Sequence, residues 1–267
     1  MNITDKNIDG GRPFDWGRTS AGYAKYRDIY PPGFYEKIIA SGLCKAGQRV
    51  LDLGTGTGVL PRNMRKFGAE WVGVDISENQ VAMARELSKG MGIDYLVSPS
   101  EAIDFPDASF DVVTACQCFW YFNAGIMPVK LSRVLKDGGK LLILYMEWLP
   151  FEDQIAGESE KLILKYNPAW SGAGETVHPI KIDGRYLEKF SLTHHEEYRL
   201  KVGFTCESWN GRVIACRGIG ASLSDAGISS LKREHQRLLE EIAPEKFEIL
   251  HYAAMAELTL KSTGGMI

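Results

Sequence analysis

The sequence predicts an α/β fold in which helices cover both faces of a doubly wound, mostly parallel sheet. From residue 48 onward, short apolar segments alternate with segments of helical spacing. The apolar segments are nearly continuous, as in strands that are buried on both faces. The first of them runs through a glycine-rich turn directly into a helical segment. These three observations together indicate parallel strands joined by helical connections.

Strands are expected where runs rich in Val, Leu, Ile and aromatic residues are bounded by polar or glycine-containing segments. Most of these runs are followed by a helical segment, which suits a parallel arrangement. The runs lie at residues 49–53, 70–74, 93–97, 110–116 and 140–146.

Helices are expected at residues 33–41, 59–66, 77–88 and 124–135. Two prolines precede the first of these segments, as is common at helix starts. Ser77 is expected to cap the third, and the fourth runs into a Gly-Gly turn.

The pattern changes after Pro150. Asn210-Gly211 is a strong hairpin signal between two apolar runs, so strands are expected at 202–209 and 212–218. The other elements expected in this part are helices at 152–166, 184–190, 229–242 and 244–260.

We expect four parts along the chain. An N-terminal cap segment spans residues 1–45, and a ligand-binding core spans 46–149. An insertion at 150–200 is expected to act as a lid that packs over the site. Residues 201–267 are expected to supply the last strands of the sheet and two helices.

Bulk properties argue against several classes of partner. The formal net charge is −3 and the pI is about 6.0, which gives no electrostatic support for nucleic-acid or anionic-membrane binding. No apolar run approaches the roughly 20 residues that a spanning helix needs. The N-terminal residues lack the pattern of a signal peptide. We therefore expect a cytoplasmic monomer or homodimer that binds no nucleic acid and no membrane.

The five cysteines are expected to be reduced and mostly buried thiols. Their number is odd, and no Cys-x-x-Cys spacing occurs. Cys116 and Cys118 lie close in sequence but lack the spacing and the partner ligands of a zinc site. No metal is expected.

The glycine-rich turn at 54–58 indicates a nucleoside ligand. Gly54 and Gly56 allow the backbone to approach a ligand closely, because neither has a Cβ. No lysine follows the glycines, which excludes a phosphate loop, and a dinucleotide motif would need glycine in place of Val59. Asp75 ends the second expected strand, 75 − 54 = 21 residues after Gly54, a distance that suits hydrogen bonds to ribose hydroxyls.

Four segments in this order resemble the class I S-adenosylmethionine-dependent methyltransferases, and especially the small-molecule group called methyltransferase type 11. They read VLDLGTGTG at 50–58, VGVDIS at 72–77, FPDASFDVV at 105–113 and RVLKDGGKL at 133–141. Each segment alone is weakly specific, but four in register are highly specific. The resemblance implies a seven-stranded, Rossmann-like methyltransferase fold with a helical insertion over the site. It also implies S-adenosylmethionine as the cofactor and S-adenosylhomocysteine as the product.

The resemblance further implies roles for individual residues. Gly54 and Gly56 would face the methionine and ribose of the cofactor, with Asp52 nearby. Asp75 would hold the ribose hydroxyls, and Ile76 would pack against the adenine.

The resemblance also implies that two other parts of the chain bind the cofactor. Many relatives have Asp where this chain has Pro99, so recognition of the adenine edge would pass to Ser100, Glu101 or backbone groups. Tyr23 and Arg27 lie in an aromatic N-terminal segment that resembles a cofactor cover, where Arg27 would pair with the cofactor carboxylate. The alternative is that Arg27 is a helix-surface arginine. The remaining cofactor-binding candidates are Thr55 and Cys116.

The acceptor is expected just past the strand at 110–116, in the segment QCFWYF at 117–122. This segment resembles one that lies beside the cofactor methyl in trans-aconitate-type and related small-acid methyltransferases. Its aromatic residues would hold the substrate or contact the sulfonium by cation–π attraction, or would instead form part of the core. No catalytic residue is assigned. The acceptor-pocket candidates are Gln117, Phe119, Trp120, Tyr121 and His178.

We expect methyl transfer from S-adenosylmethionine to a small-molecule substrate by in-line displacement, with oxygen slightly favoured as the acceptor atom. Such a transfer needs an aligned donor and acceptor in a water-poor site, and a general base only if the acceptor must lose a proton. Two alternatives remain open. One is an NAD(P)-linked oxidoreductase, which the spacing at Gly58 and Val59 disfavours. The other is a regulatory protein that binds the cofactor without catalysis.

Overall fold

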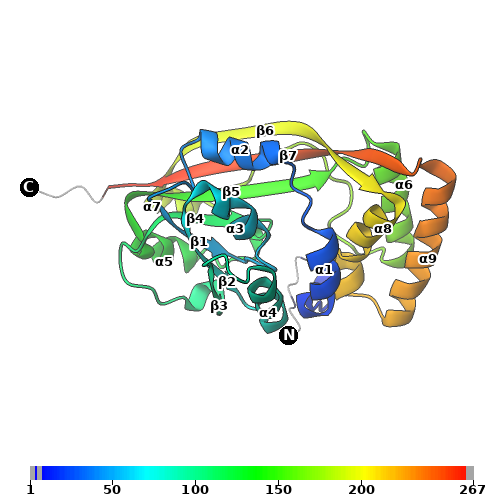
Figure 1. Cartoon of the computed structure of the whole chain (residues 1–267), viewed down its shortest axis with the longest axis horizontal. Helices are drawn as coiled ribbons and strands as arrows, with labels where there is room; N and C mark the ends of the chain where they lie inside the picture. The colour runs from blue at the N-terminus through cyan, green and yellow to red at the C-terminus, as the bar shows by residue number, and fades with distance from the viewer. Residues whose placement is uncertain (1–3, 5–7, 263–267) are drawn as a thin grey trace, which may run out of the picture. The chain divides into compact units, whose positions relative to one another are not determined.

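The computed structural model describes Thr4 and residues 8–262, and it divides the chain into two compact units (Figure 1). The core unit consists of residues 31–146, 178–198 and 253–267, and the helical unit of residues 1–30, 147–177 and 199–252. These divisions fall at other positions than the four expected parts, and the expected insertion at 150–200 contributes to both units. Residues 1–3, 5–7 and 263–267, which belong to the expected first and last parts, lie outside the described residues.

One sheet of seven strands has the order β3-β2-β1-β4-β5-β7-β6. The four pairings from β3 through to β5 are parallel. The predicted α/β fold with a mostly parallel sheet is therefore confirmed. The strands are β1 (Arg49–Leu53), β2 (Glu70–Asp75), β3 (Asp94–Val97), β4 (Phe110–Cys116), β5 (Leu135–Trp148), β6 (Phe190–Thr205) and β7 (Lys246–Leu260).

Strands β1 to β4 lie together in the core unit, with β3 at the edge of the sheet (Figure 1). Leu51 and Leu53 on β1 and Val113 on β4 are completely buried in its hydrophobic cluster. Because both faces of β1, β2 and β4 are covered, these strands carry nearly continuous apolar runs, whereas the edge strand β3 is exposed at three of its four residues. Ser77 accepts a hydrogen bond from the Gln80 N–H, which makes it the expected cap of α4. The helices of this unit are α2 (Pro32–Ala40), α3 (Val59–Met64), α4 (Glu78–Leu87), α5 (Met127–Val134) and α7 (Gly184–Lys189).

The helical unit is built around aromatic side chains. The rings of Trp148 and Trp209 meet edge to face with centroids 5.3 Å apart, and Trp170 packs on Trp148 at 6.1 Å. None of the helices among the described residues is long and apolar enough to cross a membrane. The α-helices of this unit are α1 (Ser20–Tyr26), α6 (Gln154–Tyr166), α8 (Cys206–Ile214) and α9 (Asp225–Ile242).

The predicted hairpin at 202–218 is wrong, because β6 ends at Thr205 and α8 occupies Cys206–Ile214. Thr205 and Ser208 form a reciprocal capping box, which starts a helix at this point. Asn210 donates to the Lys232 carbonyl at 3.0 Å, so its amide is engaged inside the helical unit. Tertiary contacts therefore override the local turn preference of Asn-Gly.

The predicted helix at 244–260 is also wrong, because this segment is β7. Its Ala, Met, Glu and Leu residues favour a helix locally. In the fold, however, β7 lies between β5 and β6, and residues 251–258 are all buried. A strand inside a sheet needs no alternation of apolar and polar residues, so its pattern resembles that of a buried helix.

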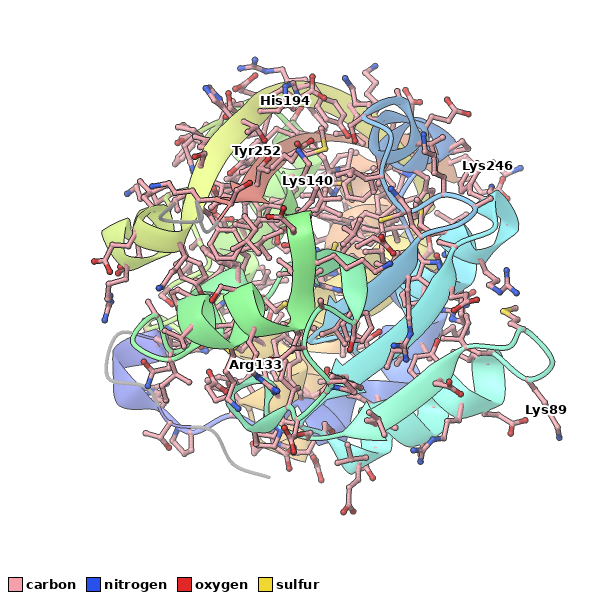
Figure 2. All side chains as sticks on the ribbon, turned by 90° about the vertical axis from the view of Figure 1, so that its left-hand side faces the viewer. Lys89, Arg133, Lys140, His194, Lys246 and Tyr252 are labelled. Carbon is pink, nitrogen blue, oxygen red and sulfur yellow. The ribbon has the colours of Figure 1, made fainter. Side chains whose placement is uncertain are left out.

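Most of β6 was also missing from the predicted elements. It lies at the edge of the sheet, and residues 191–195 are exposed, as Figure 2 shows for His194. Their polar character hides the strand from a search for apolar runs. The helices expected at 152–166, 184–190 and 229–242 are confirmed as α6, α7 and α9.

Candidate functional site

The glycine-rich turn follows β1 and leads into α3. Its three glycines, Gly54, Gly56 and Gly58, have φ angles of +63°, +56° and +74°, a region that other residues rarely adopt. A Cβ on Gly54 would lie 2.7 Å from Cys118 Sγ, and one on Gly58 would lie 2.3 Å from the Tyr95 hydroxyl oxygen. The turn therefore needs glycine both for its backbone conformation and for its close contact with these two side chains.

Asp75 joins the glycine-rich turn to the start of α4. Its carboxylate accepts hydrogen bonds from the backbone N–H groups of Gly56 and Ser77, each at 2.9 Å. Burial raises the pKa of Asp75, and the two N–H groups partly oppose this effect. A carboxylate has about four acceptor positions, so Asp75 can also accept hydrogen bonds from the hydroxyls of a ligand.

Asp52 lies in the interior of the core unit rather than on its surface. It is 2% exposed, and it accepts a hydrogen bond of 2.6 Å from the Thr114 hydroxyl on the neighbouring strand β4. Burial raises the pKa of Asp52 to about 6, although the bond from Thr114 opposes the shift. Asp52 thus links β1 to β4 just before the turn, and the buried Thr55 within the turn donates its backbone N–H to the Val74 carbonyl on β2 at 3.0 Å.

The expected adenine side is formed by residues that follow β2 and β3. Ile76 is half-buried, and the buried Ser100 begins a short 3-10 turn. One oxygen of Glu101 accepts the Asn123 N–H at 2.8 Å, which ties the loop after β3 to the loop before α5. The roles of these residues toward adenine remain predictions.

The geometry of the turn and the carboxylate beside it are suited to an adenosyl group. Three of the five residues at 54–58 are glycines, which have no side chain, and Asp75 supplies a charged acceptor at the end of β2. The turn itself contains no lysine or arginine that could hold a phosphate. This combination suits a nucleoside with free ribose hydroxyls better than a pyrophosphate.

A cavity of about 650 Å³ lies in the core unit. Its volume is within the roughly 300–1,000 Å³ that small-molecule sites have. Three of the five acceptor candidates, Phe119, Trp120 and His178, line it. Phe119 is buried at 6% exposure, whereas Trp120 is 47% exposed. Phe119 is therefore part of the hydrophobic core, and Trp120 is available to a ligand.

The other two acceptor candidates do not line the cavity. Gln117 has a positive φ of +66°, and its side-chain amide donates to the Met146 carbonyl on β5. Tyr121 packs on Trp120 with ring centroids 5.9 Å apart. The cofactor candidate Cys116 ends β4 and is paired in register with Leu144.

Tyr23 and Arg27 belong to the helical unit. Tyr23 lies on α1, and Arg27 follows the end of that helix and is half-buried. His251 is completely buried in the same unit, and burial lowers its pKa to about 3, with smaller contributions from the charges of Arg212 and Arg27. The role of Arg27 toward the cofactor carboxylate remains a prediction.

Four cavity residues that matter for its chemistry were not among the candidates. Ile180, Lys181 and Tyr186 come from the segment around the start of α7, which is distant in sequence from β4. Only Tyr145 could have been found, because it lies near the end of β5, beside the end of β4, where parallel sheets bind ligands.

Comparison with known proteins is consistent with this geometry. A family model described as a methyltransferase domain matches residues 51–143. A demethylmenaquinone methyltransferase of Thermus thermophilus is 38% identical over 113 residues, which is 40% of this chain and 51% of that protein. A ubiquinone biosynthesis O-methyltransferase of a Bradyrhizobium strain is 33% identical over 139 residues, 50% of this chain and 54% of that protein. The chain thus spans about half the length of the curated relatives it matches.

Solved structures share the fold. The YcgJ protein of Bacillus subtilis has a TM-score of 0.50 at 17% identity, covering 85% of this chain and 98% of that one. A Haemonchus contortus N-methyltransferase, solved with phosphomonomethylethanolamine and S-adenosylhomocysteine, has a TM-score of 0.52 at 20% identity, covering 96% and 58%. With four motifs in register and the sheet order above, residues 51–143 form a methyltransferase domain of the class I S-adenosylmethionine-dependent type.

Proposed function

We propose that this protein transfers a methyl group from S-adenosylmethionine to an oxygen atom of a small molecule bound in the 650 Å³ cavity. One observation carries the proposal. Cys118 lies against Gly54 of the glycine-rich turn, and the next residue, Phe119, lines the cavity. The turn and the cavity therefore share a wall inside the core unit, which brings a cofactor site and an acceptor site together.

Each part of this arrangement has a role in the proposed reaction. When bound, S-adenosylmethionine supplies a methyl group whose carbon–sulfur bond breaks as the acceptor's oxygen–carbon bond forms, leaving S-adenosylhomocysteine. Asp75 and the glycine-rich turn hold the adenosyl part of the cofactor. The apolar walls of the cavity, among them Phe119 and Trp120, exclude water and fix the position of the acceptor.

His178 is the residue we propose to accept the acceptor's proton. Its Nδ1 lies 3.0 Å from the Pro179 carbonyl oxygen, and a carbonyl oxygen can only accept. In the neutral ring the hydrogen is therefore on Nδ1, and Nε2 carries the basic lone pair. His178 also lines the cavity, which is the position that a general base for a hydroxyl acceptor requires.

Calorimetry and a transfer assay on the purified full chain test the proposal. We expect S-adenosylhomocysteine to bind, and label from S-adenosylmethionine to reach the oxygen of one or more members of a panel of phenols, hydroxy acids, quinones and amines. Asp75→Ala should weaken S-adenosylhomocysteine binding roughly 10- to 100-fold, because hydrogen bonds to a charged group are lost. His178→Gln should lower turnover without changing this affinity.

Asp94→Ala is the matched control, because Asp94 is an exposed carboxylate on the neighbouring strand β3. It should change neither binding nor turnover. Stabilisation by NADH but not by S-adenosylhomocysteine would favour an oxidoreductase and overturn the proposal. Binding of S-adenosylhomocysteine without methyl transfer to any panel member would favour a non-catalytic protein.

A further inference from the structure

Five of the residues that line the cavity or pack in its walls carry aromatic or imidazole rings that contact one another. Trp120 meets Tyr145 edge to face with centroids 5.1 Å apart, and Tyr145 lies 6.1 Å from the ring of His178 at an angle of 31°. Phe119 and Tyr186 form a second ring contact at 4.8 Å. Aromatic surfaces of this kind bind flat rings by stacked and edge-to-face contacts. A flat ligand would also cover the indole of Trp120, which is 47% exposed.

Tyr186 supplies a polar group that lacks a partner. Its side chain is 1% exposed and lines the cavity, yet its hydroxyl has no hydrogen-bond partner among the described residues. Burial and, to a smaller extent, the charge of Glu101 raise the pKa of Tyr186, so the hydroxyl stays neutral and can donate. Buried polar groups are nearly always hydrogen-bonded. A ligand oxygen that accepts from Tyr186 would satisfy it.

The charged residues that line the cavity differ in whether their charges are paired. Arg185 is paired with Asp183 through two hydrogen bonds of 2.6 and 2.8 Å, so their charges cancel. Lys181 also lines the cavity, but it forms no ion pair with any residue in the part of the chain that the structure describes. Lys181 is exposed, and its positive charge, which no described carboxylate pairs, favours an anionic group on a ligand in this cavity.

We propose that the cavity binds a hydroxylated aromatic carboxylate, with its ring against Trp120 and Tyr145, an oxygen accepting from Tyr186, and its carboxylate at Lys181. This inference rests on the proposed function in so far as the bound molecule is the methyl acceptor. The aromatic rings select a flat molecule, the Tyr186 hydroxyl selects an oxygen, and Lys181 selects negative charge. Together they name a substrate class that the fold alone does not determine.

Direct binding separates this inference from the methyl-transfer proposal. The probes are 6-hydroxy-2-naphthoate and its neutral analogue 6-hydroxy-2-naphthamide, titrated by calorimetry into the full chain with and without S-adenosylhomocysteine. We expect the naphthoate to bind at least fivefold more tightly than the amide. Lys181→Met should remove this preference, since it keeps the aliphatic stem of the side chain and removes the charge.

Two further variants make the test specific. Tyr186→Phe removes only the hydroxyl and should weaken both probes by roughly three- to tenfold. Lys189→Met, which removes an exposed lysine at the end of α7 that does not line the cavity, should leave both affinities unchanged. Equal binding of the two probes, or no binding of either, would overturn the inference even if S-adenosylhomocysteine binds. Failure of S-adenosylhomocysteine to bind, with the naphthoate preference intact, would instead overturn the proposed function alone.

Discussion

At the scale of single residues, substitution of Gly58 measures how much its close contact with Tyr95 matters for stability. Gly58→Ala places a Cβ 2.3 Å from the Tyr95 hydroxyl, whereas Gly90→Ala, at φ +80°, meets no atom within 4 Å. Both substitutions cost about 1 kcal/mol of backbone strain. Gly58→Ala should lower the free energy of unfolding by about 1 to 3 kcal/mol more, because overpacking adds to strain.

Urea titration of both variants measures this difference. Adding Tyr95→Phe to Gly58→Ala should restore part of the loss, since it removes the atom in closest contact, although the hydroxyl also hydrogen-bonds Ser88 at 2.8 Å. Equal losses in Gly58→Ala and Gly90→Ala would show that the contact with Tyr95 is unimportant.

The lowered pKa of a second residue, His235, is expected to make the stability of the protein depend on pH. It is completely buried in the helical unit, between Asn210 Oδ1 at 3.1 Å and Ser159 Oγ at 2.9 Å, and burial lowers its pKa to about 4. The unfolded chain binds a proton on this histidine below about pH 6.5 while the folded chain does not. The stability that neutral His235 contributes is therefore present above pH 6.5 and is lost as the pH falls toward 4.

We expect this histidine to account for about 2 kcal/mol of stability lost between pH 7 and pH 5. Denaturant titrations at the two pH values should show a smaller loss in His235→Gln than in the wild type. His195→Gln, at an exposed position on β6, is the control and should behave as the wild type does. An unchanged pH dependence in His235→Gln would refute the assignment.

At the scale of elements, α8 contains a glycine whose replacement should have an unusual effect. Replacing glycine by alanine inside a helix normally stabilises by about 1 kcal/mol. In α8, however, a Cβ on Gly211 would lie 2.4 Å from the ring of Tyr26 on α1. We expect Gly211→Ala to destabilise the protein by about 1 to 3 kcal/mol, because the close packing of two helices is lost.

Gly227 in α9 provides the comparison. The nearest atom to a Cβ at this position is 3.4 Å away, so Gly227→Ala should be neutral or stabilising. Thermal melts of the two variants should therefore shift in opposite directions, or only Gly211→Ala should shift. A rise in Tm for Gly211→Ala would contradict the role of this contact.

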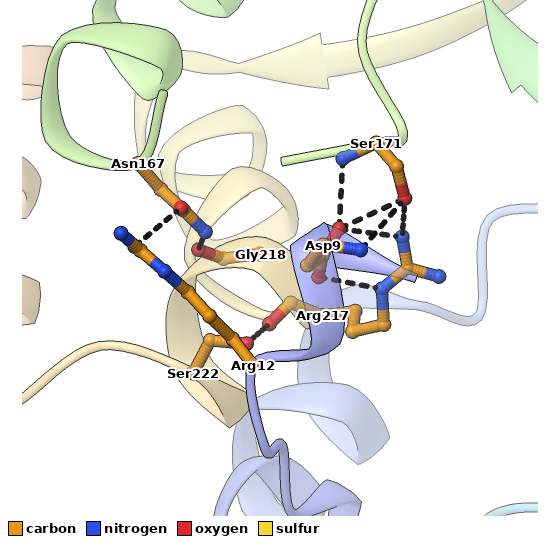
Figure 3. Close-up of polar contacts among 7 residues, drawn as sticks. All are labelled: Asp9, Arg12, Asn167, Ser171, Arg217, Gly218 and Ser222. Atoms are coloured by element: carbon orange, nitrogen blue, oxygen red, sulfur yellow. Dashed lines mark hydrogen bonds and ion pairs between the residues drawn. The ribbon is translucent and has the colours of Figure 1, made fainter. Parts of the chain in front are cut away.

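At the scale of the whole molecule, a buried cluster joins segments that are far apart in the sequence (Figure 3). Asp9 is completely buried and accepts from the Ser171 N–H at 2.7 Å and from Arg217 Nε at 3.0 Å. Burial alone would raise the pKa of Asp9, but the hydrogen bonds from Arg217 and Ser171 outweigh it and lower the pKa. The cluster therefore fixes the N-terminal segment within the helical unit, and its contribution is lost as the pH falls through this lowered pKa.

Asp9→Asn should lower the free energy of unfolding by on the order of 3 kcal/mol at pH 7, because Arg217 loses its buried charge partner. Chemical denaturation measures the loss. Asp225→Asn, which removes a highly exposed partner of Arg18, is the control and should have a much smaller effect. The difference between Asp9→Asn and the wild type should shrink below pH 4, and a constant difference down to pH 3 would contradict the role of the charge.

The residues that line the cavity were predictable only in part. Three of the acceptor candidates, Phe119, Trp120 and His178, line it, whereas Gln117 is held by β5, and their role toward an acceptor remains a prediction. Lys181 and Tyr186 carry the proposed specificity, but no pattern around them indicates that they approach β4. They reach the cavity through contacts between distant segments, such as that of the Tyr186 ring on α7 with Phe119, 186 − 119 = 67 residues away.

The sequence by itself determined the parallel strands β1 to β4 and the glycine-rich turn. These depend on local properties, namely continuous apolar runs, a helix cap at Ser77 and glycines at positive φ. Only the tertiary structure decided that 206–214 is a helix, that 246–260 is a strand, and which side chains line the cavity. In each of these cases local preferences are weak or misleading, and contacts between distant segments supply the free energy that selects the conformation.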